Sequence, residues 1–221
     1  GFITSHSVEN ISLMENEEVK KFIGKYLPDE YLLDLDKNIS MGPLAMQEVY
    51  FDKRAELSDA MEKAKDIICK VSKEFEEITG RKYDLYEKYR LDDAEYGIIV
   101  LNSTAGTAKD VIDELRENGI KAGLLKPRCF RPLPFTEIPN ELKHLKSLAI
   151  LDKSDSVNGY SGPLFSEITS AMFTQNVNVP TVNYIYGLGG MDVTTYDIKN
   201  VFKDLEDIAK EGKIDKVKRF L

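Results

Sequence analysis

Residues 96–125 read YGIIVLNSTAGTAKDVIDELRENGIKAGLL, and this stretch decides the fold. Its first six residues, 96–101, form a short apolar run of the kind that is buried in parallel sheets. A turn of small residues follows, and then a helical pattern that ends at Gly119, a residue typical of helix C-caps. The apolar run 120–125 reads as a second strand. A strand, a helix and a strand of these lengths predict a parallel βαβ unit. The apolar residues of the helix recur at helical spacing and should face the sheet: Ala108, Val111, Ile112 and Leu115.

The same alternation continues toward the end of the sequence. The remaining elements that we expect are strands at 147–152 and 181–187, helices at 162–173 and 194–210, and an edge strand near Phe220. Strands that alternate with helices of this length are typical of a mostly parallel sheet covered on both faces. Residues 94–221 are therefore predicted to form a Rossmann-like α/β domain.

Residues 1–93 have a different pattern. We expect a strand at 2–6, a short helix at 15–27, an irregular loop at 28–50 and a long helix at 52–80. Apolar residues recur along the long helix at spacings of three and four, so one of its faces needs a partner surface. They are Leu57, Met61, Ala64, Ile68, Val71, Phe75 and Ile78. Residues 1–93 should thus be a helical and irregular part linked to the domain by this helix.

Composition excludes several functional classes. The formal charge of −8 over 221 residues argues against a general nucleic-acid binder, which needs an excess of Lys and Arg. No apolar run approaches the ~20 residues that cross a bilayer, and no signal-peptide pattern opens the sequence. Cys69 and Cys129 are too few for a four-thiolate cluster or a zinc site, and we expect two reduced thiols in a cytoplasmic protein. Because the sequence begins with Gly1 and not with Met, we expect a piece of a longer protein.

In open α/β sheets, the loops at the carboxyl ends of the strands form the functional edge. The binding or interface candidates in these loops are Ser103, Thr104, Arg128, Arg131, Asp152, Gly189 and Gly190. The turn NSTAGT at 102–107 could hold a phosphate, or Ser103 or Thr104 could simply cap the next helix. The glycines of GLGG could serve only a sharp turn, and Asp152 could either pair with an arginine or cap the next loop.

No catalytic constellation is visible. The sequence has no His-Glu-x-x-His motif, no readable Ser-His-Asp arrangement, and so many acidic residues that carboxylate pairs carry no information. We therefore expect no catalytic and no metal-ligating residues in this chain. Residue patterns alone leave two alternatives open: a stand-alone nucleotide- or phosphate-binding module, and a complete small enzyme.

A set of motifs in a fixed order resembles the later part of the alpha subunit of the pyruvate:ferredoxin oxidoreductase (pyruvate synthase) family. The motifs are GFITSH, EEITGRKYDLYEKYRLDDAEYGIIVLNSTAGT, LLKPRCFRPLP, LAILDKSDSVNGYSGPLFSEI and YIYGLGGMD. The resemblance implies that residues 1–93 are the tail of a pyrimidine-binding thiamine-diphosphate domain. It also implies that residues 94–221 are a transketolase C-terminal-like domain, which agrees with the predicted sheet. Met191 departs from the family, where a basic residue is common, so an anion-binding role for GLGG is in doubt.

The resemblance also implies a function for the whole enzyme. Enzymes of this family convert pyruvate and coenzyme A to acetyl-CoA, CO2 and reduced ferredoxin, often in anaerobic metabolism. They use thiamine diphosphate, Mg2+ and [4Fe-4S] clusters. The cofactor-binding Gly-Asp-Gly pattern and the cluster cysteines are missing from this sequence. The chain is then a structural and assembly part, inactive alone, whose partners are other subunits or domains, with ferredoxin and coenzyme A for the whole enzyme. The resemblance does not decide between pyruvate and other 2-oxoacids.

The stretch LKPRCFRPLPF at 125–135 places two arginines among three prolines. Proline fixes φ and lowers the entropy lost on docking, so Arg128 and Arg131 should present rigid forks for carboxylates. Their targets could be Asp152, neighbouring loops or a partner domain. We favour such pairing over the binding of a free phosphate of coenzyme A. We also expect Arg131 to matter more, because two prolines follow it closely.

Overall fold

The structure is a computed structural model that describes residues 12–42 and 44–221. The chain divides after Leu57 into two compact units, which are described separately. The strand expected at 2–6 lies outside the described residues. No helix among the described residues is long and apolar enough to span a bilayer.

The first unit contains little regular structure. Helix α2 (Asn16–Ile23) carries acidic residues in its first turn and lysines in its last, as the helix dipole favours, and it ends at Gly24 with a φ of 74°. It is shorter than the predicted helix at 15–27. Residues 24–42 and 44–46 form turns and irregular backbone, and helix α3 (Gln47–Thr79) begins earlier than the predicted start at 52. None of the residues of α2 is buried.

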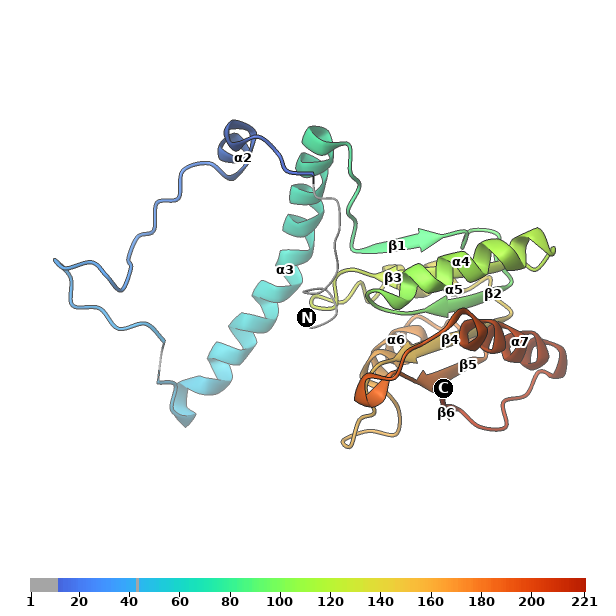
Figure 1. The fold of residues 1–221 in the computed structure, drawn as a ribbon. Helices are drawn as coiled ribbons and strands as arrows, with labels where there is room; N and C mark the ends of the chain where they lie inside the picture. The colour runs from blue at the N-terminus through green and yellow to red at the C-terminus, as the bar shows by residue number, and fades with distance from the viewer. Residues whose placement is uncertain (1–11, 43) are drawn as a thin grey trace. The chain divides into compact units, whose positions relative to one another are not determined.

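Helix α3 (Figure 1) continues into the second unit. There, one side of the helix is half-buried. Met61, Ala64, Ile68 and Phe75 lie on the half-buried side, as the apolar pattern predicts. The other three members of the predicted stripe are exposed, and they are Leu57, Val71 and Ile78. The expected apolar face is therefore narrower than the sequence pattern suggested, and α3 ends at Gly80, whose φ is 68°.

Six strands form one sheet in the order β1-β3-β2-β4-β5-β6. Their bounds are β1 Tyr86–Tyr89, β2 Tyr96–Ile99, β3 Ala122–Pro127, β4 Ser147–Asp152, β5 Thr181–Ile185 and β6 Lys218–Phe220. All neighbouring pairs are parallel except β1 and β3. The predicted mostly parallel α/β fold is confirmed, whereas the antiparallel strand β1 was not predicted.

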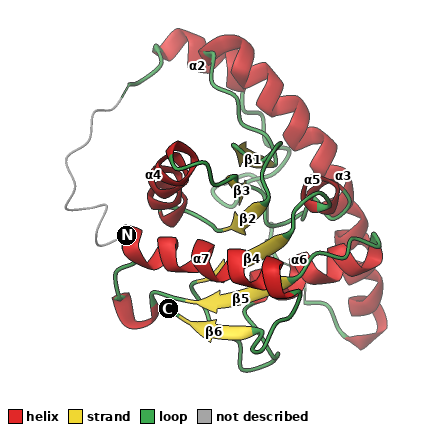
Figure 2. Ribbon diagram, turned by 90° about the vertical axis from the view of Figure 1, so that its right-hand side faces the viewer, coloured by secondary structure: helices red, strands yellow, loops and turns green. Residues whose placement is uncertain are grey.

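Helices cover both faces of the sheet (Figure 2). Their bounds are α4 Thr104–Glu117, α5 Glu137–Leu142, α6 Pro163–Thr174 and α7 Thr195–Glu211. The buried side chains of α4 and α7 share one hydrophobic core, and those of α5 and α6 share the other. Successive strand residues point to opposite faces, so Ile98 belongs to the first core and Ile99 to the second. Helix α5 was not predicted from the sequence.

The strand order fixes where the chain reverses its direction across the sheet. From β2 it proceeds through α4 to β3 on one side, and then returns through α5 to β4 on the other side of β2. The loop after β2 therefore leads toward one edge of the sheet, and the loop after the neighbouring strand β4 leads toward the other edge. Such a topological switch point is where open α/β sheets hold their ligands.

Candidate functional site

A hollow of about 210 Å³ lies at this switch point. The residues that line it come from the ends of β2, β4 and β5 and from the start of α4. They are Leu101, Asn102, Ser103, Thr104, Leu151, Asp152, Lys153 and Tyr186. Three of the candidates expected from the sequence, Ser103, Thr104 and Asp152, are thus brought together here.

The turn that opens α4 is shaped by Asn102, whose φ of 59° lies in the left-handed region. Asparagine tolerates this conformation better than most residues. Ser103 is the N-cap residue of α4, yet its side chain makes no capping hydrogen bond. Burial raises the pKa of Tyr186, and the side-chain hydrogen bond between Tyr186 and Thr104 partly offsets that rise. The hydroxyl of Thr104 is therefore hydrogen-bonded to Tyr186, directly after β5.

Asp152 is buried, and its carboxylate caps helix α6. It accepts hydrogen bonds from the backbone N–H groups of Leu164 and Phe165 at 2.8 and 3.1 Å. The side-chain amide of Asn183 donates a third hydrogen bond at 2.9 Å. Burial nevertheless raises the pKa of Asp152 above its ordinary value. Of the two roles left open by the sequence, the carboxylate serves as the cap, and no arginine among the described residues pairs with it.

Lys153 follows directly and contributes the cation of this hollow. Among residues 12–42 and 44–221 its ammonium has no hydrogen-bond or ion-pair partner. Its stem passes close to Gly187, where an added Cβ would lie 2.9 Å from Cε of the lysine. The φ of Gly187 is 63°, a backbone conformation that favours glycine. Lys153 was not among the residues predicted from the sequence, although a lysine directly after a strand-end aspartate was a usable signal.

Gly189 and Gly190 lie in the short 3-10 turn Leu188–Gly190, outside this hollow. Both have positive φ values, 66° and 86°, and nothing would contact a Cβ at either position. Their backbone conformation alone accounts for glycine.

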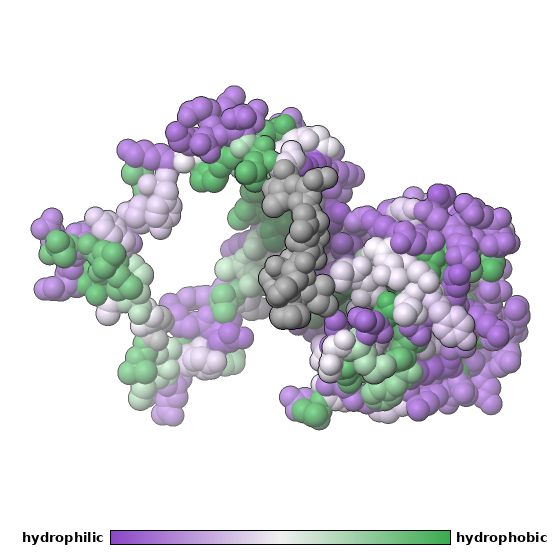
Figure 3. Space-filling model, in the orientation of Figure 1, coloured by the Kyte–Doolittle hydropathy of each residue, from purple (hydrophilic) through white to green (hydrophobic). Residues whose placement is uncertain are grey.

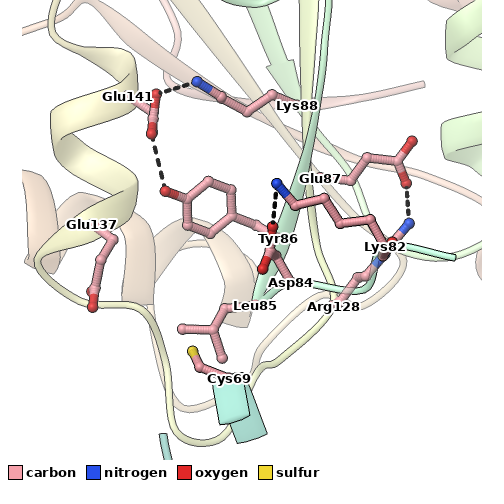
Figure 4. A pocket seen from close by; sticks show the side chains of 10 residues that line it. All are labelled: Cys69, Lys82, Asp84, Leu85, Tyr86, Glu87, Lys88, Arg128, Glu137 and Glu141. Carbon is pink, nitrogen blue, oxygen red and sulfur yellow. Dashed lines mark hydrogen bonds and ion pairs between the residues drawn. The ribbon is translucent and has the colours of Figure 1, made fainter. Parts of the chain in front are cut away.

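A second hollow, of about 640 Å³, lies beside β1 and contains Arg128 (Figure 4). The Arg128 guanidinium donates to the carbonyl oxygen of Lys82 at 3.0 Å and to Oε2 of Glu87 at 2.6 Å. It also lies 4.8 Å from the ring centroid of Tyr83. Burial raises the pKa of Glu87, but hydrogen bonds from Lys109 and Arg128 outweigh it and hold the pKa below its ordinary value.

The other charges around this hollow are also neutralised within the chain. Lys88 pairs with Glu141 at 2.9 Å, and the hydroxyl of Tyr86 donates to the same carboxylate at 3.0 Å. Burial, together with this contact, raises the pKa of Tyr86 to about 12. Lys82 pairs with Asp84, and Glu137 pairs with Lys65. The charged side chains that line this hollow are thus paired with other described residues.

Arg131 has different neighbours. Its guanidinium donates to Oε1 of Glu167 at 2.6 Å and to the carbonyl oxygen of Phe130 at 2.8 Å, and it lies over the Phe130 ring. Its side chain is 51% exposed, against 27% for Arg128. Both arginines thus meet glutamates of this chain rather than Asp152, and neither lines the switch-point hollow.

The described residues do not fit a metal ion or an iron–sulfur cluster. No three His, Cys, Asp or Glu side chains within 12–42 and 44–221 lie close enough together to hold a metal. Cys69 and Cys129 are both free and half-buried. No chemical step through such a group is therefore derived for this chain.

Residues 94–198 match the family model of the pyruvate:ferredoxin oxidoreductase core domain II. The chain is 40% identical to the pyruvate synthase subunit PorA of Thermotoga maritima over 92% of its own length and 52% of that protein. It is 36% identical to the ketoisovalerate oxidoreductase subunit VorA of Pyrococcus abyssi over 97% of its own length and 54% of that protein. A 2-oxoglutarate:ferredoxin oxidoreductase structure from Magnetococcus marinus aligns with 55% of this chain and 20% of its own, with a TM-score of 0.42 and 19% identity. The chain spans about half the length of the curated relatives it matches.

Proposed function

We propose that this chain, whose residues 94–198 belong to the pyruvate:ferredoxin oxidoreductase core domain II family, is the structural and assembly part of a PorA-like alpha subunit. The proposal rests on the family match and on 40% identity to a pyruvate synthase subunit. The whole enzyme would convert pyruvate and coenzyme A to acetyl-CoA, CO2 and reduced ferredoxin. We choose pyruvate because the chain is 40% and 39% identical to two PorA subunits, while 36% identity to a VorA subunit keeps branched-chain 2-oxoacids as the next choice.

Thiamine diphosphate, Mg2+ and [4Fe-4S] clusters would be bound by other parts of that enzyme. The described residues of this chain offer no group of metal ligands, and the sequence has only two cysteines. The partners in this proposal are the other subunits or domains, with ferredoxin and coenzyme A for the complete enzyme. Two free cysteines suit a reducing compartment, so we place the enzyme in the cytoplasm of a cell with anaerobic metabolism.

The observation that carries the assembly role is the apolar surface of the first unit. Large apolar side chains lie almost fully exposed along the segment between α2 and α3 and at the start of α3 (Figure 3). Leu33, Leu35, Leu44 and Phe51 are 85%, 99%, 89% and 80% exposed. So much exposed apolar surface marks a protein interface. We propose that the part of the PorA-like subunit that this chain does not span, together with its partner subunits, covers this surface.

The domain boundary after residue 93 belongs to the same proposal. The family match begins at residue 94, directly before β2. Strand β1 precedes that boundary but pairs with β3, so the core domain would take its first edge strand from the preceding tail. Arg128, Arg131, Gly189 and Gly190 are proposed as interface residues at the carboxyl edge of the sheet.

Reconstitution tests the assembly role. The chain would be purified alone, and also after co-expression with the remaining parts of a PorA-containing enzyme. We expect the chain alone to be colourless and inactive, and the assembled enzyme to reduce a viologen dye with pyruvate and coenzyme A. A brown preparation of the chain alone, or pyruvate-dependent dye reduction by it, would falsify the proposal.

A second candidate function is favoured by Lys153. Its unpaired ammonium, together with Ser103 and Thr104, lines the switch-point hollow, which suits one phosphate group of coenzyme A or a nucleotide. Calorimetric titration with coenzyme A and ATP tests this function. Binding should be lost in Lys153→Met and kept in Lys203→Met, a matched control whose lysine is exposed on α7. Equal heats from both variants would exclude the phosphate-binding role.

A further inference from the structure

Within the second unit, helix α3 contacts the segment that follows β3 directly at one place and through Tyr83 at another. Nζ of Lys65 lies 2.8 Å from Oε1 of Glu137, at the start of α5. Further along α3, the ring of Phe75 lies 5.8 Å from the ring of Tyr83, which the Arg128 guanidinium covers at 4.8 Å. Residues 128–137 therefore run beside α3 between its positions 65 and 75.

The two cysteines of the chain lie within this contact region. Cys69 is one turn after Lys65 on the same face of α3, is half-buried, and lines the second hollow together with Leu85 (Figure 4). Cys129 is also half-buried, and its backbone N–H donates to the carbonyl oxygen of Leu85 at 2.9 Å. Burial raises the pKa of Cys129, and the electrostatic influence of Cys69 raises it further, which places Cys69 in the surroundings of Cys129.

We propose that Cys69 and Cys129 form a reversible disulfide on exposure to peroxide, joining α3 to the segment that carries Arg128 and Arg131. The Cys69 thiolate attacks the peroxide, one oxygen is transferred to sulfur, and water leaves after protonation. The Cys129 thiolate then attacks the sulfur of the Cys69 sulfenic acid and expels the second oxygen as water. Two thiols and one hydrogen peroxide thus give one disulfide and two water molecules, and a dithiol reductant reverses the change.

The two thiols have different parts in this sequence. Cys69 lines an open hollow, so peroxide can reach it. Burial raises the pKa of Cys129, which lowers its thiolate fraction and disfavours its direct attack on free peroxide. The disulfide would restrict α3 at the half-buried face that bears Lys65 and Cys69, in the part of the helix that belongs to the second unit.

Peptide mapping of the full-length chain tests the disulfide. The reduced protein would be treated with stoichiometric hydrogen peroxide, alkylated, and digested without reductant. We expect one linked peptide pair containing both cysteines, with a mass lower by two hydrogens, that a dithiol separates. A Cys129→Ser variant should instead accumulate a sulfenic acid on Cys69 that dimedone labels. Independent oxidation of the two thiols, or cross-links only between molecules, would overturn the proposal.

Trypsin provides a second measurement on the wild-type protein, which does not depend on how the variants fold. Arg81 and Lys82 lie in the exposed connection between α3 and β1, so brief digestion there separates the two cysteines. After peroxide treatment the two fragments should migrate together on a non-reducing gel and apart on a reducing gel. Fragments that separate on both gels would show that no disulfide joins the two cysteines.

Discussion

The side-chain amide of Asn183 on β5 donates a hydrogen bond of 2.9 Å to the carboxylate of Asp152 on β4. The same amide donates to the carbonyl oxygen of Ile150, and its own oxygen accepts the backbone N–H of Gly162. Both side chains are buried, and all their polar atoms are paired. This network therefore sets the position of helix α6 relative to the carboxyl end of the sheet.

Replacing Asp152 with asparagine should destabilise the protein. The new amide would oppose one of the three N–H donors that now meet the carboxylate, from Leu164, Phe165 and Asn183. Leaving a buried donor unpaired costs about 1–3 kcal/mol. Urea unfolding at neutral pH would measure the loss. A change below ~0.5 kcal/mol would contradict the role of Asp152 as the cap of α6.

The same variant has a characteristic pH dependence. Burial raises the pKa of Asp152 above its ordinary value of 3.8, so the folded state holds a proton that the unfolded state releases. The contribution of this group to the free energy of unfolding is therefore full below pH 3.8 and falls as pH rises through the raised pKa. The wild type should lose stability across that window relative to Asp152→Asn. The free energy of unfolding of both proteins would be measured by urea titration from pH 3 upward. The same pH dependence in the wild type and in Asp152→Asn would contradict the raised pKa.

Of the two arginines in the proline-rich loop, Arg128 should contribute more to stability than Arg131, which is the reverse of the order expected from the sequence. Arg128 is the less exposed, and it meets a half-buried glutamate, a carbonyl oxygen and an aromatic ring. We expect Arg128→Ala to cost about 1–2 kcal/mol, because Glu87 loses a charged donor. Arg131→Ala should cost under ~1 kcal/mol, because its pair with Glu167 is more exposed. Thermal unfolding of both variants would compare them.

Acid sensitivity provides a control for this comparison. The pKa of Glu87 is below its ordinary value of 4.5, so its contribution to stability is present above that pH and is lost as pH falls through the folded-state pKa. Arg128→Ala should reduce this acid-dependent loss, whereas Arg131→Ala should leave it unchanged. An equal effect of the two variants would show that Arg128 does not set the pKa of Glu87.

Two glycines next to helix starts should respond oppositely to alanine. A Cβ at Gly162 would lie 2.2 Å from Cγ of Asp152, so Gly162→Ala must displace the buried carboxylate and should cost about 1–3 kcal/mol. Gly106 is helical, and nothing would contact its Cβ, so Gly106→Ala should stabilise the chain by about 0.5–1 kcal/mol. Chemical unfolding would give both values. A gain in stability from Gly162→Ala would contradict this packing.

The exposed leucines of the first unit should matter for assembly and not for the stability of the chain alone. Leu35 is 99% exposed, so Leu35→Ser should leave thermal unfolding of the isolated chain within about 0.5 kcal/mol. It should weaken association with the rest of the proposed enzyme, as measured by size-exclusion chromatography after co-expression. Val157, fully exposed in the second unit, provides the matched control Val157→Ser. Equal association of both variants would argue against the proposed interface.

The parts of the fold that the sequence predicts are those with a local signal. The predicted strand at 147–152 has the bounds of β4, because all six residues are buried and the four inner ones are apolar. Strand β1, which reads YEKY, has no apolar run and depends on pairing with β3, about 40 positions later in the chain. Helix α5 has only six residues and contains Pro139, so it shows no helical period.

The sequence predicts which loops form the candidate site, but it does not predict the partners of the side chains in them. The loops after β2 and β4 were expected at one edge, and the structure does bring Ser103, Thr104 and Asp152 into one hollow. The partner of Arg128 could not be read from the sequence, because Glu87 lies on the strand that was not predicted. That Lys153 has no partner among residues 12–42 and 44–221 is likewise a property of the folded chain and has no signal in the sequence.

Both outer strands of the sheet are short and carry charged side chains. Strand β1 contains Glu87 and Lys88, and β6 contains Lys218 and Arg219. Charged, short edge strands discourage another chain from adding its own strand, which protects an exposed sheet edge from aggregation. A larger complex built on this chain should therefore not extend the sheet from one polypeptide into the next. Its subunits would have to meet through helix faces and loops, and each sheet would end within its own chain.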